Sequence, residues 1–357
     1  MRIGLIAPPF LTVPPTGYGG TELVIDVLAR GLQEAGHDVR LFTVEESTCP
    51  VPRAWWYERA VQPMGLGAAE ATQVTAAYAE LADVDVVHDH TLLGPLVFSG
   101  RGGPPVVTTC HSPFTADLRK VYTEIARRAS VVAISRSQRA SAPMLPITRV
   151  VPHGLDLRQY APGAGAGGYL LFLARMSPDK GPHRAIRIAR AAGRRLVIVS
   201  KMREPEEFAF FASEVEPLLG PDVEFVGEVD SAERVRLLQE ATALLNPIQW
   251  PEPFGLTMIE ALACGTPVLA LRHGAAPEIV TDGRTGFLRS AADDLVECVD
   301  RLDLIDRSDC RAEALRRFSM RRMVDDYLDV YTEAMLGHCG PDRPVPAGPE
   351  LPRARAS

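Results

Sequence analysis

The sequence predicts an α/β protein made of two doubly wound, Rossmann-like domains that face each other across a cleft. Short β-branched runs alternate with helical patterns over nearly all of the 357 residues. These runs are apolar at consecutive positions, as parallel strands covered on both faces are. The alternation is interrupted at residues 156–168, which are rich in Gly, Ala and Pro, and then begins afresh. An interruption of this kind indicates a boundary between two domains.

The first series of elements forms a predicted N-terminal domain over residues 1–155. Its first helix is expected at residues 22–35, where Val24, Leu28 and Leu32 share one face and Gly36 follows as a stop. The predicted strands of this series are residues 3–7, 39–44, 84–87, 106–109, 131–134 and 149–151.

The second series forms a predicted C-terminal domain over residues 156–318. Ligands of such sheets bind at the carboxyl ends of the strands, so the site is expected in the cleft between the domains. The proline-rich tail 340–357 is predicted to be disordered. The predicted strands of this series are residues 169–174, 196–199, 223–226, 243–246 and 267–270, and the helices are residues 182–192, 205–219, 231–241 and 257–264.

Composition and charge narrow the class of protein. A formal net charge of −7 disfavours non-specific nucleic-acid binding. No apolar run approaches the roughly 20 residues of a membrane span, and the N-terminus begins with a strand-like run instead of a secretory signal. The six cysteines are scattered without a C-x-x-C pair, which is typical of reduced thiols. We therefore expect a cytoplasmic protein.

A glycine turn, residues 17–22, follows the first strand and opens the first helix. Gly19 and Gly20 allow the backbone to approach an anion, and the helix supplies free N–H groups at its positive end. A plain strand-to-helix turn is the alternative. An NAD site would need an acidic residue about 20 positions on, and Glu45 and Glu46 come somewhat later. An NAD-dependent oxidoreductase therefore remains a weak alternative.

Cations follow the first two strands of the second domain. Arg175 and Lys180 lie where the first of these strands turns to a helix, and Lys201 follows the next strand. The carboxyl ends of parallel strands meet at one edge, so these side chains should face the cleft together. Fixed cations can neutralise a diphosphate without a metal.

The segment 250–267 is the most informative stretch. Pro251 and Pro253 stiffen a loop, and Thr257 is a plausible N-cap of the helix 257–264, whose first N–H groups could bind an anion. Glu252 lies on the loop, and Glu260 is expected in the first turn of the helix. Carboxylates accept strong hydrogen bonds from sugar hydroxyls. The segment therefore suits a ligand that carries both phosphate and hydroxyl groups.

Taken in order, these segments resemble the retaining family 4 glycosyltransferases of the GT-B fold, the group 1 glycosyl transferases. The resemblance spans about residues 1–336 and includes two further markers, residues 151–156 and 277–287. It departs at His153, where the family often has Asn, and at Lys201 followed by Met202, where the family often has Gly-x-Gly or Gly-Lys. It also implies that a final helix, about residues 319–336, returns to the first domain.

The resemblance implies roles for individual residues. Arg175 and Lys180 would grip the donor diphosphate, with Lys201 a further contact. Gly19 and Gly20 would approach the phosphate from the first domain. Glu260 would hold the ribose. His111, which follows the fourth strand, and Glu252 would be the catalytic residues beside the transferred sugar. The remaining donor-binding residues implied by position are Phe254, Gly255, Leu256 and Thr257.

The implied activity is that of a metal-independent, retaining glycosyltransferase, most simply a hexosyltransferase, that uses a nucleotide-diphosphate sugar and no cofactor. The acceptor would be a small molecule, a glycan or a lipid-linked sugar, and peripheral membrane contact is compatible with the sequence. A same-face substitution assisted by the leaving phosphate is the preferred mechanism. Alternatives are a nucleotide-sugar epimerase or phosphorylase of the same fold, and a catalytically silent nucleotide-sugar-binding protein.

Two clusters imitate metal sites. Asp83 and Asp85 form a D-x-D that precedes a strand, whereas metal-binding examples follow one. His88 and His90 end the third strand and are predicted to line the acceptor side of the cleft, although structural packing and a metal site remain alternatives. The acceptor loops are expected around residues 45–75, where Trp55 and Trp56 could stack on a ring or pack internally.

Overall fold

The computed structural model describes residues 1–17 and 19–338, and within it the chain forms two parallel sheets. The first sheet has seven strands in the order β3-β2-β1-β4-β5-β6-β7, and the chain crosses over on each side of β1. Its strands are β1 (Arg2–Ile6), β2 (Asp38–Thr43), β3 (Arg53–Trp55), β4 (Val86–Asp89), β5 (Val106–Thr109), β6 (Ser130–Ala133) and β7 (Arg149–Val150).

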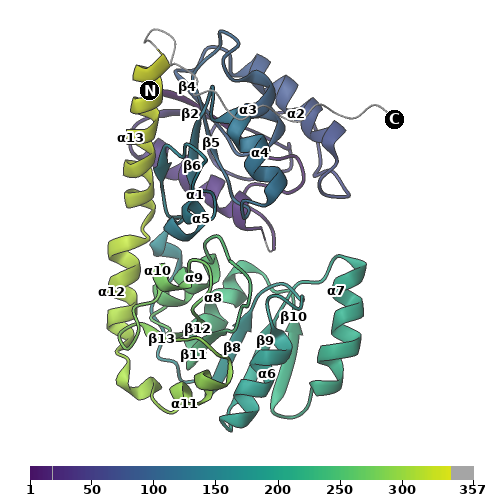
Figure 1. Ribbon diagram of the computed structural model, residues 1–357, viewed down its shortest axis with the longest axis vertical. Helices are drawn as coiled ribbons and strands as arrows, with labels where there is room; N and C mark the ends of the chain where they lie inside the picture. Colours follow the sequence, from purple (N-terminus) through teal and green to yellow (C-terminus); the bar gives the residue numbers. More distant parts are fainter. Residues whose placement is uncertain (18, 339–357) are drawn as a thin grey trace.

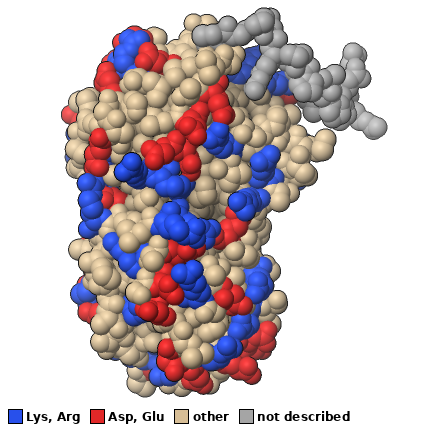
Figure 2. Space-filling model, turned by 90° about the vertical axis from the view of Figure 1, so that its left-hand side faces the viewer, with Lys and Arg blue, Asp and Glu red and all other residues tan. Residues whose placement is uncertain are grey.

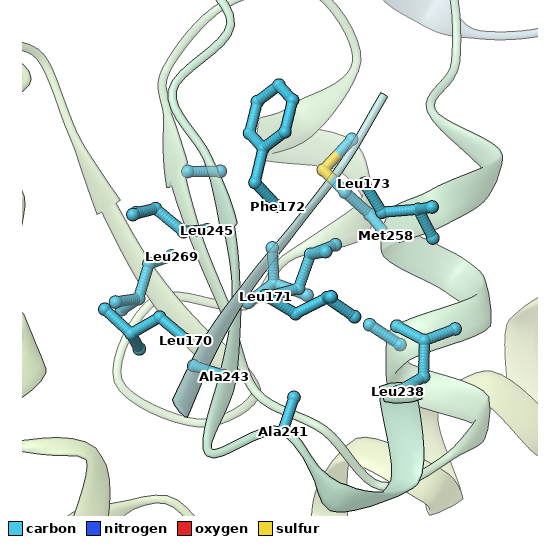
Figure 3. Close-up of a cluster of buried hydrophobic side chains, with 14 of the residues drawn as sticks. Leu170, Leu171, Phe172, Leu173, Leu238, Ala241, Ala243, Leu245, Met258 and Leu269 are labelled. Atoms are coloured by element: carbon cyan, nitrogen blue, oxygen red, sulfur yellow. The ribbon is translucent and has the colours of Figure 1, made fainter. Parts of the chain in front are cut away.

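The second sheet has six strands in the order β10-β9-β8-β11-β12-β13. The residues of β8, near the centre of this sheet, are all buried. In Figure 3, Leu173 lies beside Met258, and Leu170 points toward Leu245 and Leu269. A central strand covered on both faces needs apolar side chains at every position. The strands are β8 (Tyr169–Leu173), β9 (Arg195–Val199), β10 (Val223–Gly227), β11 (Ala243–Asn246), β12 (Val268–Leu271) and β13 (Gly286–Arg289).

Helices cover both sheets, as Figure 1 shows. Those of the first sheet are α1 (Gly20–Glu34), α2 (Gly67–Glu80), α3 (Leu93–Phe98), α4 (Ala116–Ile125) and α5 (Arg136–Ala140). Those of the second are α6 (Pro182–Ala191), α7 (Pro205–Phe210), α8 (Ser231–Glu240), α9 (Leu256–Ala263), α10 (Ala276–Ile279), α11 (Val296–Val299) and α12 (Arg307–Arg317). The prediction of two doubly wound parallel sheets is confirmed.

The last helix, α13 (Met320–His338), leaves the second sheet and runs along the side of the first, at the left of Figure 1. It packs against α1, β4 and β5, and its Met323, Tyr327 and Tyr331 are fully buried in the core of the first sheet. The tail 340–357, predicted to be disordered, lies outside the described residues.

Further contacts fix the boundary between the two halves of the molecule. The Arg322 guanidinium of α13 donates to the carbonyl oxygens of Pro152 and His153 at 2.6 and 2.9 Å. The Glu278 carboxylate of α10 accepts from the backbone N–H groups of Arg136 and Ser137 at 2.9 and 2.6 Å. Charge-assisted hydrogen bonds therefore fix the rim of the cleft and also the crossover segment, which contains Pro152 and His153 and leads to the second domain.

The α12–α13 side carries mixed charge, which Figure 2 shows as neighbouring basic and acidic side chains. Glu313 pairs with both Arg316 and Arg317 at 2.8 Å, and Arg322 pairs with Asp326 at 2.7 Å. Acidic partners thus offset the charges of Arg316, Arg317 and Arg322. No helix in the described part of the chain is both long and apolar enough to span a membrane.

Candidate active site between the two domains

The cleft contains a cavity of about 970 Å³, counting its open mouth, at the carboxyl edges of both sheets. A volume of this size is typical of small-molecule sites. The first domain supplies the start of α1 and two histidines, and the second supplies the loop and helix after β11. Its lining residues include Gly19, Gly20, Thr21, His111, His153, Lys180, Arg234, Ile248, Glu252, Phe254, Gly255, Leu256, Thr257 and Glu260.

Helix α9 begins one residue earlier than the sequence predicts. Gly255 is its N-cap, with a φ of 109° that favours glycine, and Thr257 lies inside the first turn. The predicted Thr257 cap is therefore wrong, because the left-handed backbone at Gly255 turns the chain first. Glu260 consequently lies beyond the first turn and is only 2% exposed. The N-terminal amides of α9 have no acceptor within the helix, and this end points at the cavity.

Glu252 has two partners in the cavity wall. One of its carboxylate oxygens, Oε2, accepts a hydrogen bond from Trp250 Nε1 at 2.6 Å and forms an ion pair with Lys180 Nζ. Lys180 is 5% exposed, and its ammonium also lies 4.9 Å from the centroid of the Trp250 ring. The three side chains form a compact acid–base–aromatic cluster. The sequence singled out Glu252 and Lys180, but nothing in its pattern revealed Trp250 as their partner.

Glu260 is held from two sides. Tyr160 Oη donates to its carboxylate at 2.9 Å, and Arg234 of α8 pairs with it at 3.3 Å. Arg234 also lines the cavity. Sequence reasoning missed both partners, because Tyr160 follows the crossover segment and Arg234 lies in an ordinary amphipathic helix. A cation within a helix that faces the cleft could have been suspected only once the strand order was known.

The three predicted cations do not occupy one position. Lys180 lines the main cavity, whereas Arg175 does not, and its half-exposed guanidinium lies 3.5 Å from Glu207. Lys201 lines a smaller neighbouring hollow together with Ala174 and Arg234. Burial, and then the charges of Arg203 and Arg175, lower the pKa of Lys201. The cations therefore form a short series from the cavity to its rim.

Four histidines lie behind and beside the cavity. His111 Nε2 and His90 Nδ1 are 2.9 Å apart, and the His111 ring stacks on His153 with centroids 5.3 Å apart. His153 in turn meets Phe254 edge-on at 4.9 Å. Burial lowers the pKa of His111 to about 4, so this imidazole is neutral at neutral pH. Its ring can therefore form hydrogen bonds beside a substrate without adding a charge.

His88 lies deeper than predicted. It is part of β4, fully buried, and both ring nitrogens are bonded, to Tyr331 Oη at 2.8 Å and to Thr109 Oγ1 at 2.9 Å. The prediction that it lines the cleft is not what the structure shows, because β4 runs two residues further than expected and keeps His88 inside the sheet. His90, just after the strand, does line a cavity.

That second cavity, about 760 Å³, lies within the first domain and shares Thr21 and His111 with the main one. Neither Trp55 nor Trp56 lines it, and they are 44% and 60% exposed. Its lining residues are Pro8, Phe10, Thr21, Glu22, Met64, Glu70, His90, Thr91, Leu92, Thr109, Cys110, His111, Ser112, Leu118 and Tyr122.

The two imitations of metal sites have other partners. Asp85 accepts from Arg2 at 2.7 Å, and Asp83 pairs with Arg40. Within the described residues no group of three or more His, Cys, Asp or Glu side chains could hold a metal ion. The cysteines at positions 49, 110, 264, 298 and 310 are buried free thiols.

Comparison with known proteins adds independent findings. Residues 18–159 match the family described as Glycosyltransferase Family 4, and residues 164–315 match Glycosyl transferases group 1. The chain is 26% identical to the phosphatidyl-myo-inositol mannosyltransferase of Mycolicibacterium smegmatis, over 94% of this chain and 92% of the relative. It is 29% identical to the D-inositol 3-phosphate glycosyltransferase of Saccharomonospora viridis, over 74% of each.

The fold also matches solved structures. The crystal structure of AviGT4, a glycosyltransferase involved in avilamycin A biosynthesis, superposes with a TM-score of 0.69 at 29% identity, covering 94% of this chain and 98% of that one. Both domains therefore have counterparts in known enzymes, in the same order along the chain.

Proposed function

Because this chain belongs to the family 4, group 1 glycosyltransferases and so moves a sugar from a nucleotide-sugar donor, we propose that it is a retaining enzyme that needs neither metal nor cofactor. The observation that carries this proposal is the cavity itself, which gathers Lys180, Arg234 and the N-terminal end of α9 at one point. Fixed cations and helix amides stabilise a departing phosphate without a metal.

The donor diphosphate would lie at the end of α9, against Lys180 and the glycine turn of α1. A phosphate at this position competes with Glu252 for the Lys180 ammonium. Donor binding would thereby release the Glu252 carboxylate to accept hydrogen bonds from the hydroxyls of the transferred sugar. Arg175 and Lys201, at the rim, would add charge to the phosphate side.

The nucleoside would extend toward Glu260. Tyr160 and Arg234 fix this carboxylate at 2.9 and 3.3 Å, so it is already oriented before the ribose hydroxyls arrive. A carboxylate that is already oriented loses little conformational entropy when it accepts hydrogen bonds from a ligand. This supports the ribose-binding role of Glu260.

We infer that the substitution occurs on one face of the sugar. The acceptor hydroxyl attacks the anomeric carbon while the bond to the leaving phosphate breaks, and a phosphate oxygen takes the hydroxyl proton. Lys180 and the α9 amides stabilise the charge that develops on the phosphate. Neutral His111 lies beside the reacting sugar, where its ring can hydrogen-bond a hydroxyl. Trapping a glycosyl adduct on Glu252 would contradict this mechanism.

The first test uses a panel of UDP-, GDP-, ADP- and TDP-sugars with the purified protein in EDTA. We expect one nucleotide sugar of the panel to bind, and its nucleotide diphosphate to be released slowly as the sugar is cleaved off. Lys180→Ala should weaken this binding by about ten- to a hundredfold, or about 1.4–2.8 kcal/mol. Arg175→Ala should have a smaller effect because of its rim position. Arg194→Ala is the control, since Arg194 is half-exposed and precedes β9 at the far edge of the sheet.

Other outcomes would change the proposal. A requirement for Mg²⁺ would contradict metal independence, and an inverted anomer in the NMR spectrum of the product would contradict retention. Conversion of the donor without nucleotide release would indicate an epimerase, dependence on inorganic phosphate would indicate a phosphorylase, and binding without any turnover would indicate a silent binding protein.

A further inference from the structure

The second cavity differs from the first in its charge. Glu22 and Glu70 are the charged side chains among its described lining residues, and neither lysine nor arginine lines it. The main cavity, by contrast, contains Lys180 and Arg234. The two cavities meet at Thr21 and His111, so a molecule in the second would reach the sugar held in the first.

The basic residues of the adjacent helix α4 are committed elsewhere. The Arg119 guanidinium donates to the carbonyl oxygens of Phe114 and Ser141 at 2.8 and 3.4 Å. Lys120 is 72% exposed in its side chain and lies 3.8 Å from Asp117. The charges of Lys201 and Arg203 act on Glu22 from the second domain, but neither residue lines this cavity.

The histidines add hydrogen bonds without adding charge. Burial holds the pKa of His90 well below its ordinary value and that of His111 at about 4. His90 is only 6% exposed. Its Nε2 atom is buried and has no hydrogen-bond partner among the described residues. A buried ring nitrogen without a partner is costly unless a ligand or water satisfies it.

A phosphate group would therefore be poorly accommodated. A dianion placed beside two carboxylates, with no lysine or arginine among the described lining residues, is repelled, and the loss of its hydration is not offset by charge-assisted hydrogen bonds from the cavity wall. Hydroxyl groups, in contrast, can donate to the carboxylates and bond to a neutral imidazole.

We propose that the second cavity binds the acceptor and selects a neutral, hydroxyl-rich molecule without phosphate, with His90 Nε2 bonded to one of its hydroxyls. The inference rests on the proposed function and specifies its acceptor. It separates this chain from the relatives that are named for D-inositol 3-phosphate and for phosphatidyl-myo-inositol.

The test compares matched pairs of acceptors: myo-inositol with D-inositol 3-phosphate, and methyl glucoside with its 6-phosphate. Binding to the nucleotide-loaded protein is followed by saturation-transfer NMR, and transfer by kcat/KM. We expect the neutral member of a pair to be favoured by about a hundredfold, a figure set by the repulsion of a phosphate near two acids. Preference for a phosphorylated member, or no binding of any neutral one, would overturn the proposal.

A charge substitution sharpens the test. Leu118 is half-buried on α4 and lines the cavity, so Leu118→Arg would place a cation there. This variant should shift the preference toward the phosphorylated member by about tenfold, whereas the neutral, similarly sized Leu118→Gln should not. An equal shift in both variants would contradict selection by charge.

Failure of this inference is distinguishable from failure of the proposed function. Nucleotide-sugar binding and slow transfer to water require no acceptor and are measured on the same samples. If both persist while phosphorylated acceptors are preferred, the donor site stands and only the acceptor class is wrong. If neither occurs, the proposed function itself is contradicted.

Discussion

At the residue scale, Glu252 is held by one indole and one ammonium. A substrate phosphate would compete for the Lys180 ammonium but would leave Trp250 in place. Trp250 lies on the same loop as Glu252, and its Nε1 group donates to the Glu252 carboxylate at 2.6 Å. Once Lys180 turns to the donor, this hydrogen bond alone would keep Glu252 aimed at the sugar. Trp250 is thus a positioning residue that acts through Glu252.

Replacing Trp250 by Phe keeps the ring and removes the donor. We expect kcat to fall by about tenfold, in keeping with the ~1.5 kcal/mol of a hydrogen bond to a charged group, while nucleotide affinity stays nearly constant. Trp56→Phe is the matched control, because Trp56 is 60% exposed and lines neither cavity. A loss of nucleotide affinity equal to the loss of kcat would show that Trp250 supports the loop as a whole.

The sequence predicts individual site residues where a local motif marks them. Glu252, Glu260, Lys180 and the glycine turn all lie in short, ordered patterns, and the structure brings them to one cavity. The residues that hold these groups, such as Tyr160 and Arg234, come from other elements. Their contacts depend on strand order and helix rotation, which a local pattern does not contain.

At the element scale, the approach of α1 to α13 depends on a missing side chain. A Cβ atom at Gly31 would lie 2.6 Å from Val324 Cγ2 and 2.8 Å from Met320 Cγ. Both neighbours belong to α13, so Gly31 sets how closely the returning helix can pack. Glycine is otherwise unfavourable inside a helix.

Gly31→Ala should destabilise the protein by about 1–3 kcal/mol through overpacking, even though alanine is the better helix former by about 1 kcal/mol. Gly337→Ala provides the opposite case. It lies on α13 with nothing within 4 Å of its Cβ position, so the same substitution should be neutral or stabilising. Urea unfolding of both variants measures the difference, and equal effects would contradict close packing at Gly31.

Most strands could be predicted from the sequence, whereas two edge strands and several helices, α2, α4 and α12 among them, were not. The second sheet's edge strand β13 and the first sheet's edge strand β3, with three residues, were not predicted, and α2 begins within the expected acceptor loops. A strand of three half-exposed residues lacks a clear period. Its formation depends on pairing with β2, which is a tertiary contact.

At the scale of the whole molecule, buried histidines make stability depend on pH. Burial lowers the pKa of His88 to about 3 and that of His111 to about 4, and those of His90 and His153 fall well below their ordinary value. The unfolded chain binds protons at these groups below about pH 6.5. The contribution of these four histidines to the free energy of unfolding is therefore complete above about pH 6.5 and is lost as the pH falls toward 4.

Buried acids act in the opposite sense. Burial raises the pKa of Asp89 to about 7, so its contribution to stability decreases as the pH rises toward 7. Burial also raises the pKa of Glu22, which acts in the same direction. These two acids offset part of the slope set by the four histidines. The effect of one histidine is therefore measured better as the difference in pH dependence between a variant and the wild type than from the pH dependence of the wild type alone.

His153→Asn removes one such group and introduces the residue that related enzymes often have there. Between about pH 5 and pH 6.5 the unfolding free energy of this variant should depend on pH less steeply than that of the wild type, by about 1 kcal/mol per pH unit. His273→Asn, at an exposed position, should leave the slope unchanged. Chemical denaturation at several pH values measures both, and an unchanged slope in His153→Asn would show that this ring titrates normally.

The returning helix also bears on how the chain is made. Because Met323, Tyr327 and Tyr331 of α13 fill the core beneath the first sheet, that sheet cannot be completed while the ribosome is still synthesising the second domain. The second sheet, whose strands and α6–α12 lie together in sequence, can close earlier. The half of the protein that emerges first therefore finishes last, and until then its apolar face is open to chaperones or to aggregation.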